Sequence, residues 1–210
     1  METIKELTAR YPGLAGCGAE IEKAADLIIE TYRHGGCLFT CGNGGSAADS
    51  DHIVGELMKG FLKKRPVDGE FRGKLKEAFP DDGEFLAQNL QRGLAAVSLH
   101  SQSALLTAFV NDVEPSMMYA QTLYAMGKSG DCLIAISTSG SSKNVVNAAK
   151  IAKAMGVNVI SLTGNRPCRL DDLADIAIHV DDCETYRVQE LHLPVYHWLC
   201  ARVEEEFFAE

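Results

Sequence analysis

Short apolar runs alternate along the chain with longer segments whose apolar residues recur every three to four positions. The strand-sized runs cover residues 37–40, 94–99, 133–136, 157–162 and 176–180. Most of the segments between them have the spacing of amphipathic helices. Because strands that alternate with helices pair in parallel and carry the helices on their faces, the pattern predicts an α/β fold with a central parallel sheet flanked by helices.

The two ends of the chain have the clearest helical spacing. An N-terminal helical segment is expected over about residues 1–35, with apolar positions at Ile21, Ala25, Ile28, Ile29 and Tyr32. A long terminal helix is expected over residues 185–208, with a stripe formed by Val188, Leu191, Val195, Leu199 and Val203. Pro194 lies inside this stripe. Because proline removes one backbone hydrogen bond, we expect it to interrupt and kink the helix.

The segment over about residues 59–92 breaks the alternation. It is charged, punctuated by glycine and proline, and contains only short helical patches, so it is expected to be an excursion on the surface. The sequence contains no internal repeat, low-complexity tract or recognisable linker. A length of 210 residues suits one hydrophobic core, and we therefore expect a single domain over residues 1–210.

Composition narrows the classes of partner. The formal net charge of -9 provides no positive field that would draw the chain to nucleic acid or to anionic lipid, so neither is expected as a partner. The seven cysteines form no CxxC pair, which favours reduced thiols. The N-terminus lacks a signal-peptide pattern, and no apolar run approaches membrane-spanning length. We therefore expect a cytoplasmic protein.

A glycine-rich segment, here called the glycine loop (residues 42–46), follows the first apolar run and leads into a helical pattern. Three glycines at positions 42, 44 and 45 surround Asn43 and precede Ser46. Backbone N–H groups at the start of a helix are free to bind an anion, and glycine allows the anion to approach closely. The same composition also suits an ordinary tight turn between a strand and a helix.

A second segment, here called the serine loop (residues 137–142), follows the apolar run 133–136 and opens another helical pattern. It presents five hydroxyl side chains around Gly140, whereas a helix cap needs only one. A generous capping cluster is the alternative interpretation. Both loops are expected at the carboxyl ends of parallel strands, where such folds bind ligands. Two anion cradles in one small chain indicate a phosphorylated ligand.

Titratable side chains provide candidate chemistry. His52 and Glu56 are four residues apart, so on a helix they share one face and suit two ligands of one metal ion, although such a pair also occurs by chance on solvated helices. Gln189 and His197 are eight residues apart on the expected terminal helix. A glutamate near a metal ion can abstract the proton beside a carbonyl, and a histidine can relay a proton between neighbouring oxygens. Together these groups suit an aldose–ketose isomerase.

The chain resembles the sugar isomerase (SIS) domain proteins of the phosphoheptose isomerase type in three separated motifs, which are CGNGGSAADSDHIVGEL, AISTSGSSKNVVNAAKIAKAMGVNVISLTG and YRVQELHLPVYH. The resemblance covers nearly the whole chain except the excursion. It implies a flavodoxin-like three-layer sandwich that assembles as a homotetramer with active sites at subunit interfaces. It also implies interconversion of sedoheptulose 7-phosphate and D-glycero-D-manno-heptose 7-phosphate through an enediolate, as a step of carbohydrate metabolism.

The resemblance assigns the reacting groups residue by residue. It implies one Zn²⁺ ion per subunit, with ligands at His52, Glu56, Gln189 and His197. It also implies that Glu56 is the catalytic base and His197 the catalytic acid. All four family residue types are present at these positions.

The resemblance also implies a set of substrate-binding residues. The family's sugar-contacting loop, turn, phosphate loop and terminal helix correspond to Asn43, Gly44, Gly45, Ser46, Asn111, Asp112, Ser137, Thr138, Ser139, Ser142 and Gln189. Of these, Asn111 and Asp112 match a turn that meets sugar hydroxyls.

Two departures leave the substrate open. The excursion replaces a short connection of the family's bacterial heptose enzymes, and Gly60, with Lys59 beside it, stands where a basic residue is expected. One alternative is therefore an isomerase of another sugar phosphate. Another is a non-catalytic regulatory protein that binds a sugar phosphate. A binding protein has no need for the four metal-ligand positions, so their joint presence favours an enzyme.

Overall fold

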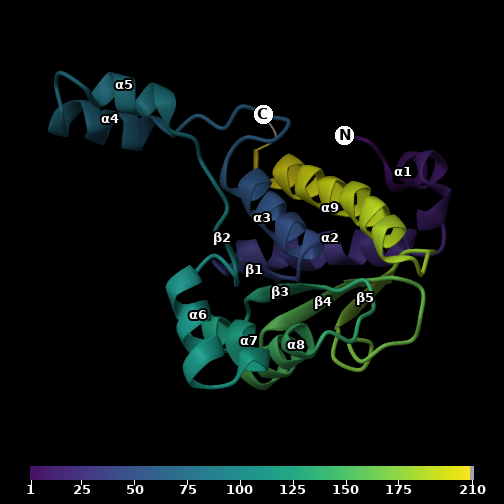
Figure 1. The fold of residues 1–210 in the computed structure, drawn as a ribbon. Helices are drawn as coiled ribbons and strands as arrows, with labels where there is room; N and C mark the ends of the chain where they lie inside the picture. The colour runs from purple at the N-terminus through teal and green to yellow at the C-terminus, as the bar shows by residue number, and fades with distance from the viewer. Residues whose placement is uncertain (209–210) are drawn as a thin grey trace.

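The computed structural model describes residues 1–208, which form an α/β fold around one five-stranded sheet (Figure 1). Its strands are β1 (Leu38–Cys41), β2 (Ala96–Ser98), β3 (Cys132–Ile136), β4 (Asn158–Thr163) and β5 (Ile176–His179). All neighbouring strands are parallel, in the order β2-β1-β3-β4-β5. This is the strand order of flavodoxin-like doubly wound sheets. The predicted fold class is confirmed, and each expected apolar run overlaps a strand.

Helices cover both faces of the sheet. They are α1 (Ile4–Arg10), α2 (Gly18–Arg33), α3 (Gly45–Met58), α4 (Gly69–Ala78), α5 (Gly83–Asn89), α6 (Ser103–Asp112), α7 (Met118–Met126), α8 (Lys143–Met155) and α9 (Thr185–Phe208), with short 3-10 turns η1 (Pro12–Leu14) and η2 (Pro115–Met117). Figure 1 shows α2, α3 and α9 on one face and α6, α7 and α8 on the other. Across residues 1–208, no helix combines the length and the apolar character that a membrane crossing requires.

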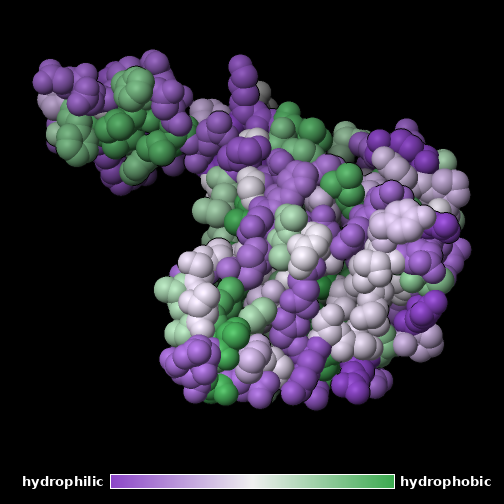
Figure 2. Space-filling model, in the orientation of Figure 1, coloured by the Kyte–Doolittle hydropathy of each residue, from purple (hydrophilic) through white to green (hydrophobic). Residues whose placement is uncertain are grey.

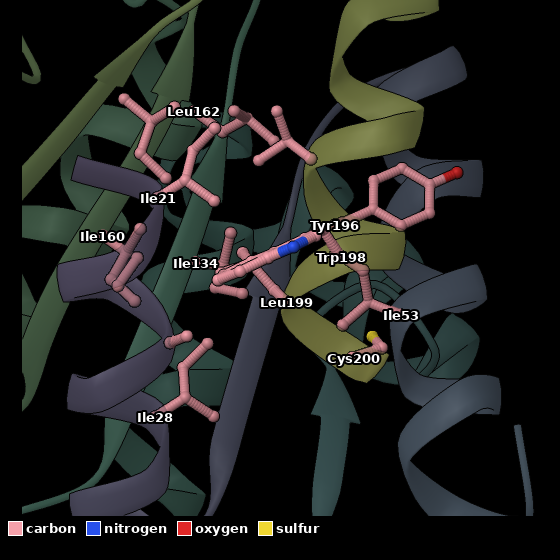
Figure 3. Packing of buried hydrophobic residues seen from close by; sticks show 14 of the residues in the cluster. Ile21, Ile28, Ile53, Ile134, Ile160, Leu162, Tyr196, Trp198, Leu199 and Cys200 are labelled. Atoms are coloured by element: carbon pink, nitrogen blue, oxygen red, sulfur yellow. The ribbon is translucent and has the colours of Figure 1, made fainter. Parts of the chain in front are cut away.

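The strands divide the core between the two faces because successive side chains of a strand point in opposite directions. In β3, Cys132, Ile134 and Ile136 belong to the cluster beneath α2, α3 and α9. Leu133 and Ala135 belong to the cluster on the other side, with α7 and α8. All five β3 residues are buried, as expected of a central parallel strand. Figure 3 shows α9 contributing Trp198, Leu199 and Cys200 to the first cluster.

The terminal helix α9 runs through Pro194 as a single element. The predicted interruption is therefore wrong. Pro194 is itself buried, and α9 has buried apolar side chains before and after it, including Val188 and Val203. Proline costs about 3 kcal/mol or more inside a helix, whereas each fully buried Val or Leu side chain stabilises by about 1.5–3 kcal/mol. Packing on both sides of the proline thus holds the helix together.

The excursion forms a helical hairpin, α4 and α5, that stands away from the rest of the molecule (Figure 1). The two helices pack mainly on each other. Figure 2 shows apolar side chains gathered on one side of the hairpin. Its exposed apolar residues are Phe71, Phe79 and Phe85. The expected excursion thus contains two short helices in the structure.

The root of the excursion is tied to α9 by a buried ion pair. Arg65 Nε donates to Glu204 Oε1 at 2.8 Å, and its Nη1 donates to the carbonyl oxygen of Leu57 at 2.7 Å. The Glu204 carboxylate also accepts the backbone N–H groups of Phe61 at 2.8 Å and Leu62 at 2.7 Å. Burial by itself raises the pKa of Glu204, but these hydrogen bonds and Arg65 together lower it. The segment after α3 is therefore fixed where it leaves the core.

Candidate functional site

The glycine loop follows β1 and the serine loop follows β3, at the carboxyl ends of two neighbouring strands. Strand β1 lies between β2 and β3, so the order of strands along the sheet reverses beside it. Ligands of open α/β sheets bind in the crevice at such a reversal. The topology therefore places both loops where this fold binds its ligand.

The glycine loop brings α9 close to the start of α3. Gly44 has φ +56°, a left-handed conformation that favours glycine. A Cβ atom at Gly45 would lie 2.5 Å from Gln189 Nε2, so a larger residue there would displace this amide. Gln189 on α9 thus lies directly against the glycine loop, although the two are far apart in sequence. The structure brings these three predicted site residues together.

Asn43 in the glycine loop uses its side-chain amide for internal hydrogen bonds. Its Nδ2 donates to Asn144 Oδ1 at 2.9 Å, and Asn144 Nδ2 donates back to Asn43 Oδ1 at 2.8 Å. The buried Tyr119 hydroxyl donates to the carbonyl oxygen of Gly42 at 2.6 Å and lies 3.1 Å from Asn43 Oδ1. Since Asn144 belongs to α8, this amide pair joins the glycine loop to the helix that follows the serine loop.

The serine loop gathers its hydroxyl groups around a close backbone turn. Gly140 has φ +59°, and a Cβ atom there would lie 2.1 Å from Cys168 Sγ. Ser137 Oγ donates to Ser142 Oγ at 3.2 Å, and Ser139 Oγ accepts the N–H of Ser141 at 3.3 Å. Although Ser142 caps α8 by position, its side chain makes no capping hydrogen bond within the described chain. Helix capping therefore does not account for the Ser142 hydroxyl.

A cavity of about 320 Å³ opens beside the serine loop. Thr138 and Ser139 line one part of it, and Asn165 and Arg166 line another. The cavity is thus lined by hydroxyl-bearing residues and by a basic residue, which suits a phosphate. The sequence prediction did not include Arg166, which lies 24 or more residues beyond the serine loop and is brought to it by β4.

His52, Glu56 and His197 form what is here called the helix-face cluster. His52 Nε2 lies 3.3 Å from Glu56 Oε1, as their spacing of one helical turn on α3 predicts. His197 Nε2, on α9, lies 3.5 Å from His52 Nε2. The imidazole rings of His52 and His197 meet edge to face, with centroids 4.9 Å apart. The structure thus brings together three of the four residues predicted to bind zinc, from two different helices.

The surroundings of the cluster change its electrostatics. Burial lowers the pKa of His197, and His52 lowers it further, whereas Glu56 acts in the opposite direction. Lys59 Nζ lies 3.3 Å from the other carboxylate oxygen of Glu56. A basic side chain therefore does stand beside the glutamate, although Gly60 occupies the position where the resemblance placed one. The ring of Phe61 packs against His197 with centroids 5.6 Å apart.

The donor chemistry of the cluster fits a zinc ion. Histidine nitrogens and glutamate oxygens bind Zn²⁺ at about 2.0–2.2 Å, so two ligand atoms of a tetrahedral site lie about 3.3–3.5 Å apart. The Nε2 atom of His52 meets this spacing toward Glu56 and toward His197, at 3.3 and 3.5 Å. The set is not complete, however. Among residues 1–208, no three or more His, Cys, Asp or Glu side chains together form an arrangement that could hold a metal ion.

Asn111 and Asp112 lie apart from this constellation. They are the last two residues of α6 rather than a free turn, and both are exposed. Asn111 Nδ2 donates to Asp112 Oδ1 at 2.7 Å, and within residues 1–208 neither side chain hydrogen bonds to the other predicted site residues. The chain on its own therefore does not unite them with the helix-face cluster.

Besides Arg166, sequence reasoning missed four residues beside the glycine loop and the helix-face cluster: Asp49, Tyr119, Asn144 and Tyr196. Asp49 lies three residues before His52 on α3, a spacing that could have been noticed. Tyr196 and His52 are hydrogen-bonded across 144 positions of sequence, and no local pattern shows such a contact.

Comparison with known proteins agrees with this architecture. The model of the SIS domain family matches residues 14–89 and 74–164. A phosphoheptose isomerase of Thermodesulfovibrio yellowstonii is 35% identical over 188 residues, which cover 90% of this chain and 81% of that protein. One of Akkermansia muciniphila is 31% identical over 205 residues, covering 98% and 95%.

Solved structures of phosphoheptose isomerases are similar to this chain as well. A phosphoheptose isomerase from Francisella tularensis superimposes with a TM-score of 0.77 at 25% identity, covering 95% of this chain and 92% of that one. The enzyme from Neisseria gonorrhoeae gives a TM-score of 0.72 at 28% identity, covering 96% and 91%. The similarity therefore extends over nearly the whole chain.

Proposed function

Because this chain belongs to the SIS domain family and is an isomerase of the phosphoheptose isomerase type, we propose that it interconverts sedoheptulose 7-phosphate and D-glycero-D-manno-heptose 7-phosphate. The observation that carries the proposal is the pairing of two loops at the strand-order reversal with a cluster of two histidines and a glutamate. The loops suit a phosphorylated sugar, and the cluster suits proton transfer.

The phosphate is proposed to bind at the serine loop. Ser137, Thr138, Ser139 and Ser142 offer hydroxyl donors, and the start of α8 offers backbone N–H groups and the positive end of a helix dipole. These local donors bind an anion although the chain as a whole has a net charge of -9. The sugar is proposed to extend toward the glycine loop, where Gly44, Gly45 and Ser46 begin α3.

Glu56 and His197 are proposed to move the protons. An aldose–ketose isomerase removes a proton from the carbon beside the carbonyl and returns one to the former carbonyl carbon. Glu56 is the proposed base for this transfer through an enediolate. Burial and His52 lower the pKa of His197. His197 is the proposed acid, which would pass a proton between the two neighbouring sugar oxygens.

One Zn²⁺ ion per subunit is proposed to bind at His52, Glu56, Gln189 and His197. When bound, the ion would polarise the sugar carbonyl and stabilise the negative charge that develops on its oxygen. The spacing around His52 Nε2 supports this assignment. Gln189 lies against Gly45, so its amide can contact both the ion and a sugar held by the glycine loop.

Asn111 and Asp112 are proposed to complete the site in a homotetramer. Helix α6 supports this, since it has no buried residue although most of its side chains are apolar. A helix of this kind normally packs against a partner. In an assembly of four copies, the exposed end of α6 can meet the sugar bound by a neighbouring copy. Within a single chain, this end of α6 lies apart from the other proposed site residues.

The test follows conversion of sedoheptulose 7-phosphate by the purified protein, with added zinc and with a chelator. Fructose 6-phosphate serves as the competing substrate, because the excursion leaves room for a different sugar preference. We expect zinc-dependent turnover of the heptulose and little of the hexulose. Turnover of fructose 6-phosphate alone would move the assignment to another sugar phosphate, and turnover of neither would contradict the proposed reaction.

A further inference from the structure

A line of hydrogen bonds leads from His52 back to a carboxylate that the proposed chemistry does not use. His52 Nδ1 lies 3.1 Å from the hydroxyl oxygen of Tyr196, and this hydroxyl lies 3.1 Å from Asp49 Oδ1. Tyr196 is on α9, whereas Asp49 and His52 lie one turn apart on α3. The line therefore depends on the packing of these two helices.

The direction of the hydrogen bonds follows from the donors available. A carboxylate only accepts, and a tyrosine hydroxyl has a single hydrogen. Tyr196 therefore donates to Asp49, and its oxygen accepts from the Nδ1–H group of His52. A neutral imidazole with its proton on Nδ1 has its lone pair on Nε2. In this structure Nε2 is the atom that faces Glu56 and His197, at 3.3 and 3.5 Å.

Burial strengthens the arrangement. Tyr196 is 1% exposed, and Figure 3 shows its hydroxyl pointing away from the apolar side chains of the core. The second oxygen of Asp49, Oδ2, is buried and has no hydrogen-bond partner within residues 1–208. Within the described chain, Tyr196 is thus the one residue whose side-chain hydroxyl donates to this carboxylate, at Oδ1.

Ring packing fixes the orientation of His52 as well. The rings of Tyr196 and His52 meet edge to face, with centroids 5.4 Å apart and planes at 69°. The Tyr196 ring also packs edge to face on His197, with centroids 5.1 Å apart. One side chain therefore holds both histidines of the helix-face cluster.

We propose that Asp49 and Tyr196 are positioning residues that hold the proton of His52 on Nδ1 and aim the Nε2 lone pair at the place where a divalent cation binds. The inference rests on the proposed function, which gives this lone pair an ion to bind. Hydrogen bonds to the far nitrogen of a metal-binding histidine commonly fix its tautomer in this way, and their loss costs about 10–100-fold in metal affinity.

Three variants test the proposal. Tyr196→Phe removes only the hydroxyl. Asp49→Asn keeps the shape but adds an N–H donor, which allows Tyr196 to donate to His52 Nδ1 and so favours the opposite tautomer. Tyr32→Phe is the matched control, because it removes a tyrosine hydroxyl that donates to the carbonyl oxygen of Ala95, away from the cluster.

The first measurement needs no metal ion. Nitrogen NMR of the metal-free protein, labelled at histidine and held at about pH 8.5, well above the ordinary histidine pKa of about 6.5, reports which ring nitrogen of His52 carries the proton. We expect Nδ1–H in the wild type and in Tyr32→Phe, a mixture in Tyr196→Phe, and mainly Nε2–H in Asp49→Asn. A wild-type His52 with its proton on Nε2 would overturn the proposal.

The second measurement is Zn²⁺ affinity, by competition with a chromophoric chelator. We expect Tyr196→Phe to bind about 10–100-fold more weakly and Tyr32→Phe to bind within about twofold of the wild type. Equal affinity of Tyr196→Phe and wild type, with an unchanged tautomer, would overturn the proposal even if Zn²⁺ binds. A wild type that binds no Zn²⁺ but has the expected tautomer would contradict the proposed function and support the positioning of His52.

Thermal unfolding of each variant separates positioning from general stability. Because Asp49→Asn preserves the shape of the side chain, it keeps the test available if Tyr196→Phe does not fold. A purely structural role predicts that Tyr196→Phe and Tyr32→Phe lose stability while the tautomer of His52 stays the same in both.

Discussion

The serine loop and the helix-face cluster are the two halves of the candidate site, and they are built differently. The serine loop consists of consecutive residues between β3 and α8, so its donors are fixed by one turn of backbone. The helix-face cluster joins His52 and Glu56 of α3 to His197 of α9, 141 or more positions further along the chain. A change in the loop should therefore have a local effect, whereas the cluster should also respond to changes in helix packing.

The largest effect is expected at Glu56, because the helix-face cluster carries the proposed proton transfer and the serine loop does not. Glu56→Gln removes the proposed base but leaves the serine loop intact. We expect kcat to fall about 10²–10⁴-fold, the usual contribution of a general base, with little change in KM. Steady-state kinetics with sedoheptulose 7-phosphate measures both constants. Glu70→Gln, at an exposed position of the hairpin, is the control. A Glu56→Gln enzyme with wild-type kcat would show that another group takes the proton.

The next effect tests whether the cluster depends on packing. Arg65→Met should destabilise the fold by about 3–5 kcal/mol, because it leaves the Glu204 carboxylate buried without its charge partner. The side chains of this pair are 0% and 1% exposed. Arg65 Nη2 also donates to the Glu56 carbonyl oxygen at 3.2 Å, so kcat should fall as well. Urea unfolding followed by circular dichroism measures the stability.

The hairpin offers a matched ion pair for comparison. Arg72 pairs with Glu84, but these side chains are 50% and 37% exposed. Arg72→Met should therefore cost less than about 1 kcal/mol and leave kcat unchanged. Equal losses in the Arg65 and Arg72 variants would mean that the root of the excursion does not support the cluster.

A third effect concerns the stability of the fold at acid pH. It depends on α9, the helix that carries His197 of the cluster. His192 on α9 is fully buried beside the backbone of Thr163, and neither ring nitrogen has a partner in hydrogen-bonding geometry within residues 1–208. Burial lowers the pKa of His192 to about 4. The unfolded chain takes up this proton near pH 6.5, but the folded chain does so only near pH 4. Stability from this source is therefore complete above pH 6.5 and lost as the pH falls toward 4.

Replacement of His192 by leucine should remove this acid sensitivity. The gap between about 4 and the ordinary 6.5, at about 1.4 kcal/mol per pH unit, corresponds to about 3.5 kcal/mol. The wild type should lose about this much more stability than His192→Leu between pH 6.5 and 4, as measured by calorimetry across that range. His34→Leu, at an exposed histidine, should behave like the wild type. Parallel pH profiles for wild type and His192→Leu would contradict this account.

The smallest effect is expected in the serine loop, where several proposed donors would share one phosphate. Ser142→Ala should raise KM about tenfold, since one hydrogen bond to a charged group contributes about 1.5–3 kcal/mol, and kcat should hardly change. Inorganic phosphate should also become a weaker competitive inhibitor. Ser141→Ala, at the exposed neighbouring hydroxyl, is the control. A loss of kcat without a change in KM would place Ser142 in the chemical step instead.

Much of the fold could be predicted because its signals are local. Each strand overlaps an apolar run of the sequence, and α9 begins and ends at the predicted Thr185 and Phe208. Pro194 shows where a local rule fails. From the sequence one can tell that proline removes a backbone hydrogen bond. Only the buried side chains on both sides of the proline explain why the helix continues.

The candidate site divides in the same way. The glycine and serine loops could be predicted because glycine residues and hydroxyl side chains are typical of a turn at the start of a helix. The pairing of His52 with Glu56 was visible because four residues make one helical turn. Asn111 and Asp112 were expected in a turn that meets the sugar, yet in the single chain they end α6 and stand apart, so their role stays a prediction.

The sequence by itself determined the parallel α/β fold, the glycine and serine loops that lead into α3 and α8, and the His52 and Glu56 pair, because each depends on residues within one element or one turn. Only the tertiary structure decided that Gln189 lies against Gly45, that His197 meets His52, and that Tyr196 connects His52 to Asp49. These contacts join α9 to α3 across more than 130 residues. They depend on how two helices pack on one sheet, and no local pattern of residues encodes that distance or orientation.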